Sequence, residues 1–538
     1  MSAGAHVDGP PLRDLQDLIW AGDIPAIGRR SFPDRLALIC PECDARTSYA
    51  QLDRQSDAFV ALVRERGLRA GDRVAYLGRN SDQFAPVLFG AIRAGVVLVP
   101  LNWRLAAPEL AYQIADADAR LLILDSEFEP LARESLATCE HEIPTLFTEA
   151  RGAVTSSPCL RALLAREAPA VPCSHEAAQP ILQLYTSGTT GKPKGVLVSH
   201  RAFSLARHME LIDPGLTHLQ AGAVLLSPMP NSHIGGISWM AMGLVRQGTV
   251  VLTADPSAPN LLRLMREFKV EHTFIVATVI RALVDELRQQ GIPGPQLRGM
   301  FYGAMPMSEL LLREALQTFG CAFVQFFGMT EITGSATLLP PPQHDLAHSG
   351  YLKSVGRPYP GTELEIRGPD RRVLQRGEAG EIWIRSPTLM LGYSRLPQKT
   401  REVVAGGWYA SGDGGYLDED GWLFLTDRIK DMIVSGGENV YPHEVEEALR
   451  AHTSVLDAAV VGLPDDRWGE CVAALVQLRP GKGATEEELR SFARSRIAAF
   501  KCPRRIFFAD MLPRTAAGKV QRVEVRRTLR ERAGAPKG

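Results

Sequence analysis

Strand-like and helix-like segments alternate from about Thr47, and this alternation restricts the possible folds more than any other feature of the sequence. Apolar residues recur at helical spacing in some segments, and short apolar runs typical of strands separate them. Strands that are joined through helices pair in parallel, and helices then cover both faces of the sheet. The chain is therefore predicted to be an α/β protein. The expected helices are 49–67, 81–95 and 107–117, and the expected strands are 72–77, 96–101 and 120–124.

The pattern changes twice along the chain. Residues 148–179 are expected to be a connector, and a second alternating block covers 223–328. Beyond Gly356 short strands and tight turns follow, with a strand at 380–385 and a hairpin that turns at Asp420-Gly421. Past residue 429 a helix that Pro442 opens, strands at 455–461 and 472–478, and a capping box at 485–488 predict a separate small unit. We expect a large N-terminal domain over 1–429, with mixed and parallel sheets, flanking helices and a small β-subdomain, and a small α+β C-terminal domain over 430–538.

Composition and charge narrow the functional classes. The 538 residues are 45% hydrophobic and 22% charged, as in an ordinary globular protein with a large core. A formal net charge of −1 argues against nucleic acid or an anionic membrane as the partner. The first residues lack the apolar core of a signal peptide, and no apolar run is long enough to span a bilayer, so a cytoplasmic protein is expected.

The eight cysteines are scattered, and only Cys40-Pro-Glu-Cys43 has the spacing of a metal or redox pair. A zinc site needs two further ligands, and no second pair follows. The flanking strand-like residues make this segment the tip of a hairpin. Free thiols throughout the chain, and hence a reducing compartment, are expected.

A dense cluster of hydrogen-bond donors occupies Tyr185-Thr-Ser-Gly-Thr-Thr-Gly-Lys-Pro-Lys-Gly-Val196. Four aliphatic hydroxyls, three glycines and two lysines follow the apolar run 181–184 directly. Glycines let backbone N–H groups approach an anion, and hydroxyls and lysines add donors and positive charge. The segment predicts a cradle for a polyphosphate at the end of a strand. It is not a Walker loop, because Pro193 stands where that pattern requires glycine.

Together with this cradle, widely spaced motifs resemble those of the adenylate-forming acyl-CoA synthetases, which include aryl-CoA ligases and are related to peptide-synthetase adenylation domains and firefly luciferase. The resemblance covers about residues 47–527. The other motifs are Tyr302-Gly-Ala-Met-Pro306, Gln325-Phe-Phe-Gly-Met-Thr-Glu331, Ser411-Gly-Asp413, Asp427-Arg-Ile-Lys-Asp-Met-Ile433, Ser435-Gly-Gly-Glu-Asn-Val-Tyr-Pro442 and Pro513-Arg-Thr-Ala-Ala-Gly-Lys519.

The resemblance implies a reaction in two halves. A carboxylate attacks the α-phosphate of ATP to give an acyl-adenylate and pyrophosphate, and the thiol of coenzyme A then displaces AMP. ATP, Mg²⁺ and coenzyme A are the implied cofactors. For the first half, Lys519 is expected to stabilise the developing negative charge, Thr330 to touch the α-phosphate, and Glu331 with Thr186 to bind Mg²⁺. The residues expected to hold the other phosphates are Thr186, Ser187, Gly188, Thr189, Thr190 and Lys194.

Nucleotide and thiol recognition are implied in the same way. Asp413 and Arg428 resemble the residues that contact the ribose, Gly303-Ala304 the backbone along the adenine, and Phe327 an aromatic that stacks on the ring. For the second half the small mobile domain is expected to rotate about Lys430. Gly436, Gly437 and Trp468 would then border coenzyme A, and His233 the acid and the thiol's route. Core packing for Phe326-Phe327, a packed Trp468 and a structural His233 are the alternatives.

Other functions fit parts of this pattern. The acyl group could pass to the thiol of a carrier protein, or the chain could be a non-catalytic nucleotide-binding homologue. A luciferase-like oxygenase has no supporting feature. Small residues after His233, namely Gly235, Gly236, Ala241 and Gly243, suggest a roomy cavity for a medium- or long-chain fatty acid or a bulky cyclic acid. Homodimers are common in such families.

Overall fold

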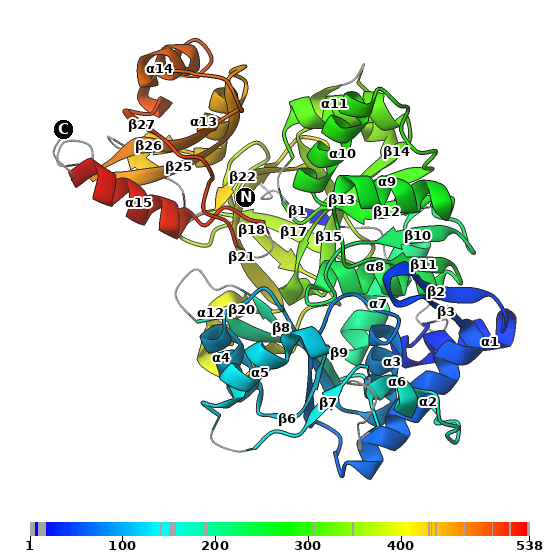
Figure 1. Ribbon diagram of the computed structural model, residues 1–538. Coiled ribbons are helices and arrows are strands. Elements are labelled where there is room, and N and C mark those ends of the chain that lie inside the picture. The colour runs from blue at the N-terminus through cyan, green and yellow to red at the C-terminus, as the bar shows by residue number, and fades with distance from the viewer. Residues whose placement is uncertain are drawn as a thin grey trace. The chain divides into compact units, whose positions relative to one another are not determined.

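The first alternating segments of the chain build a seven-stranded sheet (Figure 1) in the order β19-β9-β8-β5-β4-β6-β7. Strands β4 to β8 pair in parallel with their neighbours, and β8 and β9 form an antiparallel pair. Parallel pairing was expected from the alternation and is confirmed. The bounds are α2 (Tyr49–Glu65), β4 (Arg73–Leu77), α3 (Phe84–Ala94), β5 (Val97–Leu101), α4 (Ala107–Ala117), β6 (Ala119–Leu124), α5 (Glu129–Leu136), β7 (Thr145–Phe147), β8 (Pro180–Thr186), β9 (Lys194–Ser199) and β19 (Gly392–Tyr393).

Strand β4 shows how helices cover both faces of this sheet. Ala75 and Leu77 join the core beneath α4 and α5. The ring of Tyr76 points the other way and meets Phe84 of α3, with 5.2 Å between ring centroids. Successive strand residues face opposite sides of a sheet, so a strand buried on both faces is apolar throughout.

The strands of the later alternating block belong to a second sheet, within which they pair in the order β16-β15-β14-β13-β12-β10-β11 and continue to β2 and β3. Helices α9, α10 and α11 share one core with its strands, and α7 and α8 share another (Figure 1). The strands are β2 (Leu36–Cys40), β3 (Ala45–Ser48), β10 (Val224–Ser227), β11 (Thr249–Leu252), β12 (His272–Ile275), β13 (Gly299–Gly303), β14 (Ala322–Met329), β15 (Gly334–Leu339) and β16 (Ser354–Pro358). The helices are α1 (Ile24–Ser31), α7 (His200–Ile212), α8 (Ile234–Val245), α9 (Ala258–Glu267), α10 (Ala277–Gln290) and α11 (Glu309–Phe319).

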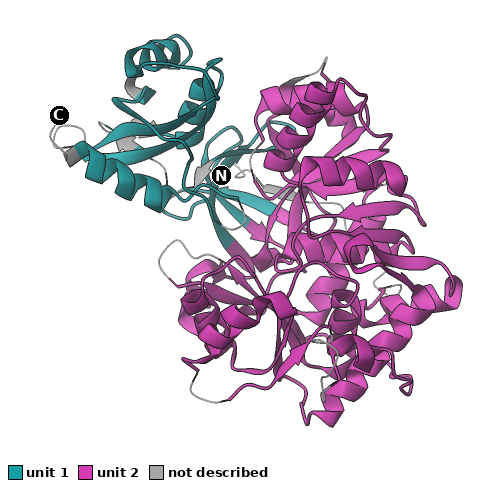
Figure 2. Ribbon diagram, viewed as in Figure 1, with its two compact units in different colours: residues 1–7, 364–383, 410–538 teal, residues 8–363, 384–409 magenta. Residues whose placement is uncertain are grey.

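This computed structural model divides into two compact units (Figure 2). The larger unit comprises residues 8–363 and 384–409, and the smaller comprises 1–7, 364–383 and 410–538. The residues described are 6–8, 18–139, 142–149, 158–186, 192–216, 218–305, 307–346, 349–428, 431, 433–435, 438–465, 469–497, 499–515 and 518–534. Among them no helix is long and apolar enough to cross a membrane.

The smaller unit contains short antiparallel strands and a separate sheet with helices on both faces. Alternate residues of β25 belong to two cores: Ala458 and Val460 pack with α13 and α14, and Ala459 and Val461 pack with α15. The strands are β1 (His6–Asp8), β17 (Glu363–Arg367), β18 (Gly380–Arg385), β21 (Trp408–Leu417), β22 (Leu423–Arg428), β23 (Ile433–Ser435), β24 (Glu438–Val440), β25 (Val455–Asp465), β26 (Gly469–Leu478) and β27 (Arg505–Phe508). The helices are α13 (Pro442–Arg450), α14 (Glu486–Arg494) and α15 (Arg522–Gly534).

The segment 148–179 contains the short helix α6 (Leu160–Leu164) and is otherwise irregular where it is described. Helix α12 (Pro397–Val403) and strand β20 (Val404–Ala405) complete the larger unit. The domain boundary after residue 429 stays a prediction.

Free thiols throughout the chain were expected, and this expectation is wrong at the hairpin tip. Cys40 and Cys43 form a disulfide between the ends of β2 and β3. The short turn of Pro41–Cys43 brings the two sulfurs together. The hairpin itself was predicted correctly, and the other six cysteines are free.

Candidate functional site

The glycine-rich motif begins and ends on the antiparallel pair β8 and β9. Thr186 and Lys194 are cross-strand partners, so the loop between them starts and closes at one place. The hydroxyl of Tyr185 donates to Asp116 Oδ2 over 2.7 Å, which fixes the start of the loop against α4. Burial raises the pKa of Tyr185, and the hydrogen bond to Asp116 raises it further. Residues Ser187, Gly188, Thr189 and Thr190 lie outside the described residues.

Glu331 lies in a short 3₁₀ turn, Thr330–Ile332, directly after β14. Glu331 is only 8% exposed, and its Oε1 accepts a hydrogen bond of 3.0 Å from the hydroxyl of Tyr393. Burial, followed by the charge of Glu331, raises the pKa of Tyr393 above its ordinary value. The tyrosine hydroxyl therefore keeps its proton at neutral pH and orients the carboxylate.

Tyr393 also meets the end of the glycine-rich motif. The Nζ atom of Lys194 lies 4.7 Å from the centroid of the Tyr393 ring. Strand β19 holds this ring in place, because Tyr393 pairs with Val196 of β9. A lysine from one motif and a carboxylate from another thus meet at one aromatic side chain. A cation–π interaction with Lys194 and a hydrogen bond to Glu331 thus hold a positive and a negative group against the same side chain.

The segment before β19 holds the turn of Glu331 in position. The N–H of Met390 donates to the carbonyl oxygen of Glu331 over 2.8 Å. The hydroxyl of Thr388 donates to the carbonyl of Ile332 over 2.9 Å, and Thr333 donates back to the carbonyl of Thr388 over 2.7 Å. These bonds satisfy a buried turn whose last residue, Thr333, has left-handed backbone geometry with φ of 58°.

The sequence alone does not predict a role for Tyr393. Its partner Glu331 lies 62 residues away in the chain, so no local spacing links the two. The available signal was weak: Gly392-Tyr393 is an aromatic after a glycine, outside the recognised motifs. Gly392 has φ of 143°, a conformation that glycine adopts readily.

The residues expected at the adenine lie where β13 and β14 end. A Cβ atom at Gly303 would stand 2.3 Å from the carbonyl oxygen of Phe326, so the close approach of the two strands requires this glycine. Ala304 is exposed, with left-handed φ of 62°. Phe326 packs in an aromatic core with Phe301, so Phe327, the next strand residue, faces the opposite side. Core packing therefore explains Phe326, and Phe327 on the other face is buried as well. Stacking of Phe327 on the adenine stays a prediction.

His233 precedes helix α8 and is half-buried at the helix N-terminus. The roomy cavity expected from the small residues after it is not supported. A Cβ atom at Gly236 would lie 2.4 Å from the carbonyl oxygen of Pro230, and one at Gly243 would lie 2.7 Å from Val250 Cγ2. These glycines allow close packing against neighbouring backbone and strand, so they leave no open space. Ala241 is fully buried, and Gly235 faces Phe274.

The ribose candidates and the catalytic candidate Lys519 lie in the smaller unit. Asp413 and Arg428 are backbone partners across β21 and β22. The turn before Asp413 is held by Ser411, whose hydroxyl donates to the carbonyl of Ile382 over 2.7 Å. Lys519 is exposed on a tight loop closed by the pairing of its backbone with Thr515. Lys430, Gly436, Gly437 and Trp468, and the side chain of Arg428, lie outside the described residues.

The residue types around Tyr393 fit a magnesium nucleotide. A carboxylate offers about four acceptor positions, and the hydrogen bond from Tyr393 uses one of them at Glu331. Carboxylate and hydroxyl oxygens are the hard ligands that Mg²⁺ prefers, and Thr186 ends the strand that leads into the loop. Lys194 supplies positive charge for phosphate oxygens. The arrangement can hold a metal-bound polyphosphate and stabilise negative charge.

Comparisons with known proteins agree with this chemistry. The model of the AMP-binding enzyme family matches residues 28–394, and that of the AMP-binding enzyme C-terminal domain matches 444–519. The chain is 38% identical to the fatty acid–[acyl-carrier-protein] ligase ScoC of Streptomyces coeruleorubidus, over 90% of this chain and 92% of that protein. It is 35% identical to a feruloyl-CoA synthase of an Amycolatopsis species, over 93% and 99% of the two chains. The o-succinylbenzoate CoA synthetase of Bacillus subtilis, solved with an acyl-adenylate intermediate, superposes with a TM-score of 0.82 at 28% identity, over 96% and 99% of the chains.

Proposed function

Because the chain belongs to the AMP-binding enzyme family, we propose that it is an ATP-dependent acyl-CoA synthetase that activates a carboxylic acid as acyl-AMP and transfers the acyl group to coenzyme A. The observation that supports this most is the convergence of Lys194 and Glu331 on Tyr393. A lysine of the motif expected to bind phosphate and a carboxylate suited to Mg²⁺ contact the same tyrosine. The same synthetase from Bacillus subtilis has also been solved with ATP and a magnesium ion, which supports both as cofactors.

Each half of the proposed reaction uses different residues of the chain. In the first half, Thr186 and Glu331 would hold Mg²⁺, and Lys194 with the glycine-rich loop would bind the β- and γ-phosphates. Bound Mg²⁺ would neutralise charge on the phosphates. Thr330, at the start of the same turn as Glu331, would donate to the α-phosphate.

Several residues would recognise the nucleotide. Phe327 and the backbone of Gly303-Ala304 would hold the adenine, and Asp413 and Arg428 the ribose. Lys519 would place its ammonium where negative charge develops between the carboxylate and the α-phosphate. In the second half, His233, Gly436, Gly437 and Trp468 would border the acid or the thiol. Rotation about Lys430 would exchange the two faces of the C-terminal domain.

A second candidate function has a specific observation in its favour. The 38% identity to a fatty acid–[acyl-carrier-protein] ligase supports a carrier-protein thiol as the acceptor. The two acceptors share the chemistry of a phosphopantetheine thiol, so the adenylation half is the same for both. The acid is proposed to be a medium- or long-chain fatty acid or a bulky cyclic acid, as the names of the relatives suggest.

The test is pyrophosphate release over a panel of fatty and aryl acids, with ATP and Mg²⁺. AMP release is then followed with coenzyme A or with a holo carrier protein as the acceptor. We expect acid-dependent pyrophosphate release, with AMP release faster in the presence of coenzyme A. Faster release with the carrier protein alone would instead establish the second candidate. Glu331→Gln is the matched variant, and it should lose at least about 100-fold in acid-dependent pyrophosphate release, because a metal ligand is removed with little change in shape.

A further inference from the structure

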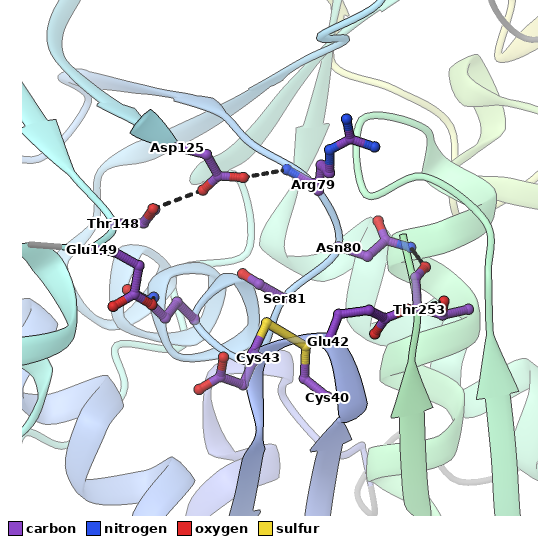
Figure 3. Close-up of a disulfide and its surroundings, with 12 residues drawn as sticks. Cys40, Glu42, Cys43, Arg79, Asn80, Ser81, Asp125, Thr148, Glu149 and Thr253 are labelled. Atoms are coloured by element: carbon purple, nitrogen blue, oxygen red, sulfur yellow. Dashed lines mark hydrogen bonds between the residues drawn. A yellow bond between two sulfur atoms is a disulfide. The ribbon is translucent and has the colours of Figure 1, made fainter. Parts of the chain in front are cut away.

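The disulfide at the tip of the β2–β3 hairpin has no role in the proposed reaction. Figure 3 shows the disulfide at the tip of the hairpin. Cys40 is fully buried at the end of β2, whereas Cys43 is only partly buried. Of the described cysteines only these two are joined, and the other six are free. One accessible sulfur is enough for a thiol reagent to enter, because exchange begins by attack on a single sulfur.

Glu42, which lies between the two cysteines, connects the disulfide to the residue that follows β11. Its Oε1 accepts a hydrogen bond from the hydroxyl of Thr253, a fully buried residue directly after β11. Figure 3 shows Glu42 reaching from the hairpin tip toward Thr253. The disulfide restricts the turn of Pro41–Cys43, so it also restricts the position of Glu42.

Asn80 carries this connection further. Its Nδ2 donates to the carbonyl of Thr253 over 3.0 Å and to that of Met229 over 2.9 Å. Its Oδ1 accepts the N–H of Asn231 over 3.0 Å, and Asn80 and Asn231 are both buried. Asn231 stands two positions before His233 in the segment that opens helix α8. A continuous set of contacts thus leads from the disulfide to the loop that carries His233.

Other contacts fix the loop of residues 79–82, which carries Asn80, on the side that faces away from Thr253. Asp125 accepts the N–H of Arg79 over 2.8 Å and the hydroxyl of Thr148 over 2.8 Å (Figure 3). Asp82 forms a two-pronged ion pair with Arg161, at 2.9 and 3.0 Å. Because these contacts fix one side of the loop, a structural change at the hairpin tip can be transmitted through the hydrogen bonds of Asn80 toward Asn231.

We propose that Cys40–Cys43 is a reversible thiol–disulfide modification site that a cellular dithiol reduces. Its redox state alters the mobility of the loop that carries His233, through the contacts of Glu42, Thr253 and Asn80. A thiolate of the dithiol attacks Cys43 Sγ, the S–S bond breaks, and Cys40 leaves as a thiolate that takes a proton. The second thiolate of the reagent then displaces Cys43. Two cysteine thiols and one oxidised reagent result, for two electrons and two protons. The effect on kinetics rests on the proposed function, whereas the modification site does not.

The first arm of the test follows the thiols themselves, with EDTA present. Full-length protein is either oxidised or treated with dithiothreitol, and it is then alkylated. Mass spectrometry measures the mass of the peptide that contains Cys40 and Cys43. We expect two alkyl groups after reduction, none after reoxidation, and recovery of the oxidised form over repeated cycles. A pair that stays alkylatable after mild oxidation would overturn the site, whatever the enzyme's activity.

The second arm measures the coupling. Hydrogen exchange of the peptide spanning 228–236 should be faster in the reduced form, and the KM for the acid should change at least threefold. The Cys40→Ser/Cys43→Ser variant should show the hydrogen exchange and the KM of the reduced protein, and dithiothreitol should change neither. Glu42→Ala should keep reversible oxidation but lose both responses, whereas Asp44→Asn, in the same turn, should retain them. Equal exchange in the two redox states of the unaltered protein would refute the coupling even if no acid substrate had been found.

Discussion

At the scale of single residues, Tyr393 joins the two charged groups on which the proposed chemistry depends. Its ring lies beside Lys194 and its hydroxyl donates to Glu331. The sequence alone indicated which motifs would bind phosphate and Mg²⁺, because each requires particular donors or ligands at short spacing. Tyr393 was not predictable, since its role depends on the pairing of β19 with β9.

Replacing Tyr393 with phenylalanine separates these two contacts. The ring remains beside Lys194, and the hydrogen bond that orients Glu331 is lost. We expect the Mg²⁺ concentration needed for half-maximal pyrophosphate release to rise about tenfold, the usual effect of removing an outer hydrogen bond to a metal ligand. Tyr416→Phe, which removes a hydroxyl from a ring stacked on Phe424, is the control. An unchanged Mg²⁺ dependence in Tyr393→Phe would argue against the orienting role.

Lys519 allows the two half-reactions to be tested separately. The Lys519→Ala variant should form acyl-adenylate at least about 100-fold more slowly, because a charge that stabilises the transition state is removed. Thioester formation from added acyl-adenylate should remain within about threefold of the unaltered enzyme if the lysine acts only in the first half. Lys482→Ala, at another exposed loop lysine of the same unit, should affect neither step. Similar losses in both steps would contradict the division of roles.

At the scale of elements, local signals in the sequence were the most reliable. The capping box at Thr485 begins α14 and proline begins α13, as predicted. A capping box at Ser48, which was not predicted, begins α2. The strands β25 and β26 extend beyond their predicted ends, because antiparallel pairing continues the ladder past the apolar residues. Tertiary packing caused the main error, in which glycines of α8 were taken as space for the substrate.

The packing role of these glycines can be measured. In Gly236→Ala the new Cβ would meet two backbone carbonyl oxygens, 2.4 and 2.6 Å away, and backbone cannot move aside as a flexible side chain can. We expect a loss of about 1–3 kcal/mol in the free energy of unfolding. Gly350→Ala, where no atom lies within 4 Å of the added carbon, should change it by less than about 0.5 kcal/mol. Unaltered stability together with a changed acid preference in Gly236→Ala would restore the cavity interpretation.

At the scale of the whole molecule, the alternation in the sequence predicted parallel sheets with helices on both faces. It did not predict that residues 364–383 and 410–428 would belong to the smaller compact unit. That grouping depends on contacts between segments far apart in the sequence. The cysteine pair shows the same limit, since spacing alone did not decide between thiols and a disulfide.

Buried histidines make the stability of the whole protein depend on pH. His344 Nδ1 donates to the carbonyl of Pro340, so its Nε2 carries no proton and accepts from the hydroxyl of Tyr302 over 3.0 Å. Burial lowers the pKa of His344 to about 4, below the ordinary value of about 6.5. The unfolded chain therefore binds the proton first. The contribution of this residue to stability is complete above about pH 6.5 and is lost as the pH falls toward about 4.

His344→Gln keeps a donor and an acceptor but cannot titrate. Between pH 7 and pH 5 the free energy of unfolding should fall by roughly 2 kcal/mol more in the unaltered protein than in this variant. Urea unfolding followed by tryptophan fluorescence measures the difference. Parallel loss of stability in the two proteins would show that His344 does not contribute to the acid sensitivity.

The most direct test of the proposed function follows an oxygen atom. An acid that supports pyrophosphate release is labelled with ¹⁸O in its carboxylate, and the enzyme is allowed to turn over with ATP, Mg²⁺ and the thiol acceptor. If the carboxylate attacks the α-phosphate, one labelled oxygen must appear in the AMP that is released. Mass spectrometry should then find AMP heavier by about 2 Da, in an amount equal to the thioester. Unlabelled AMP, or ADP as the nucleotide product, would contradict activation through an acyl-adenylate.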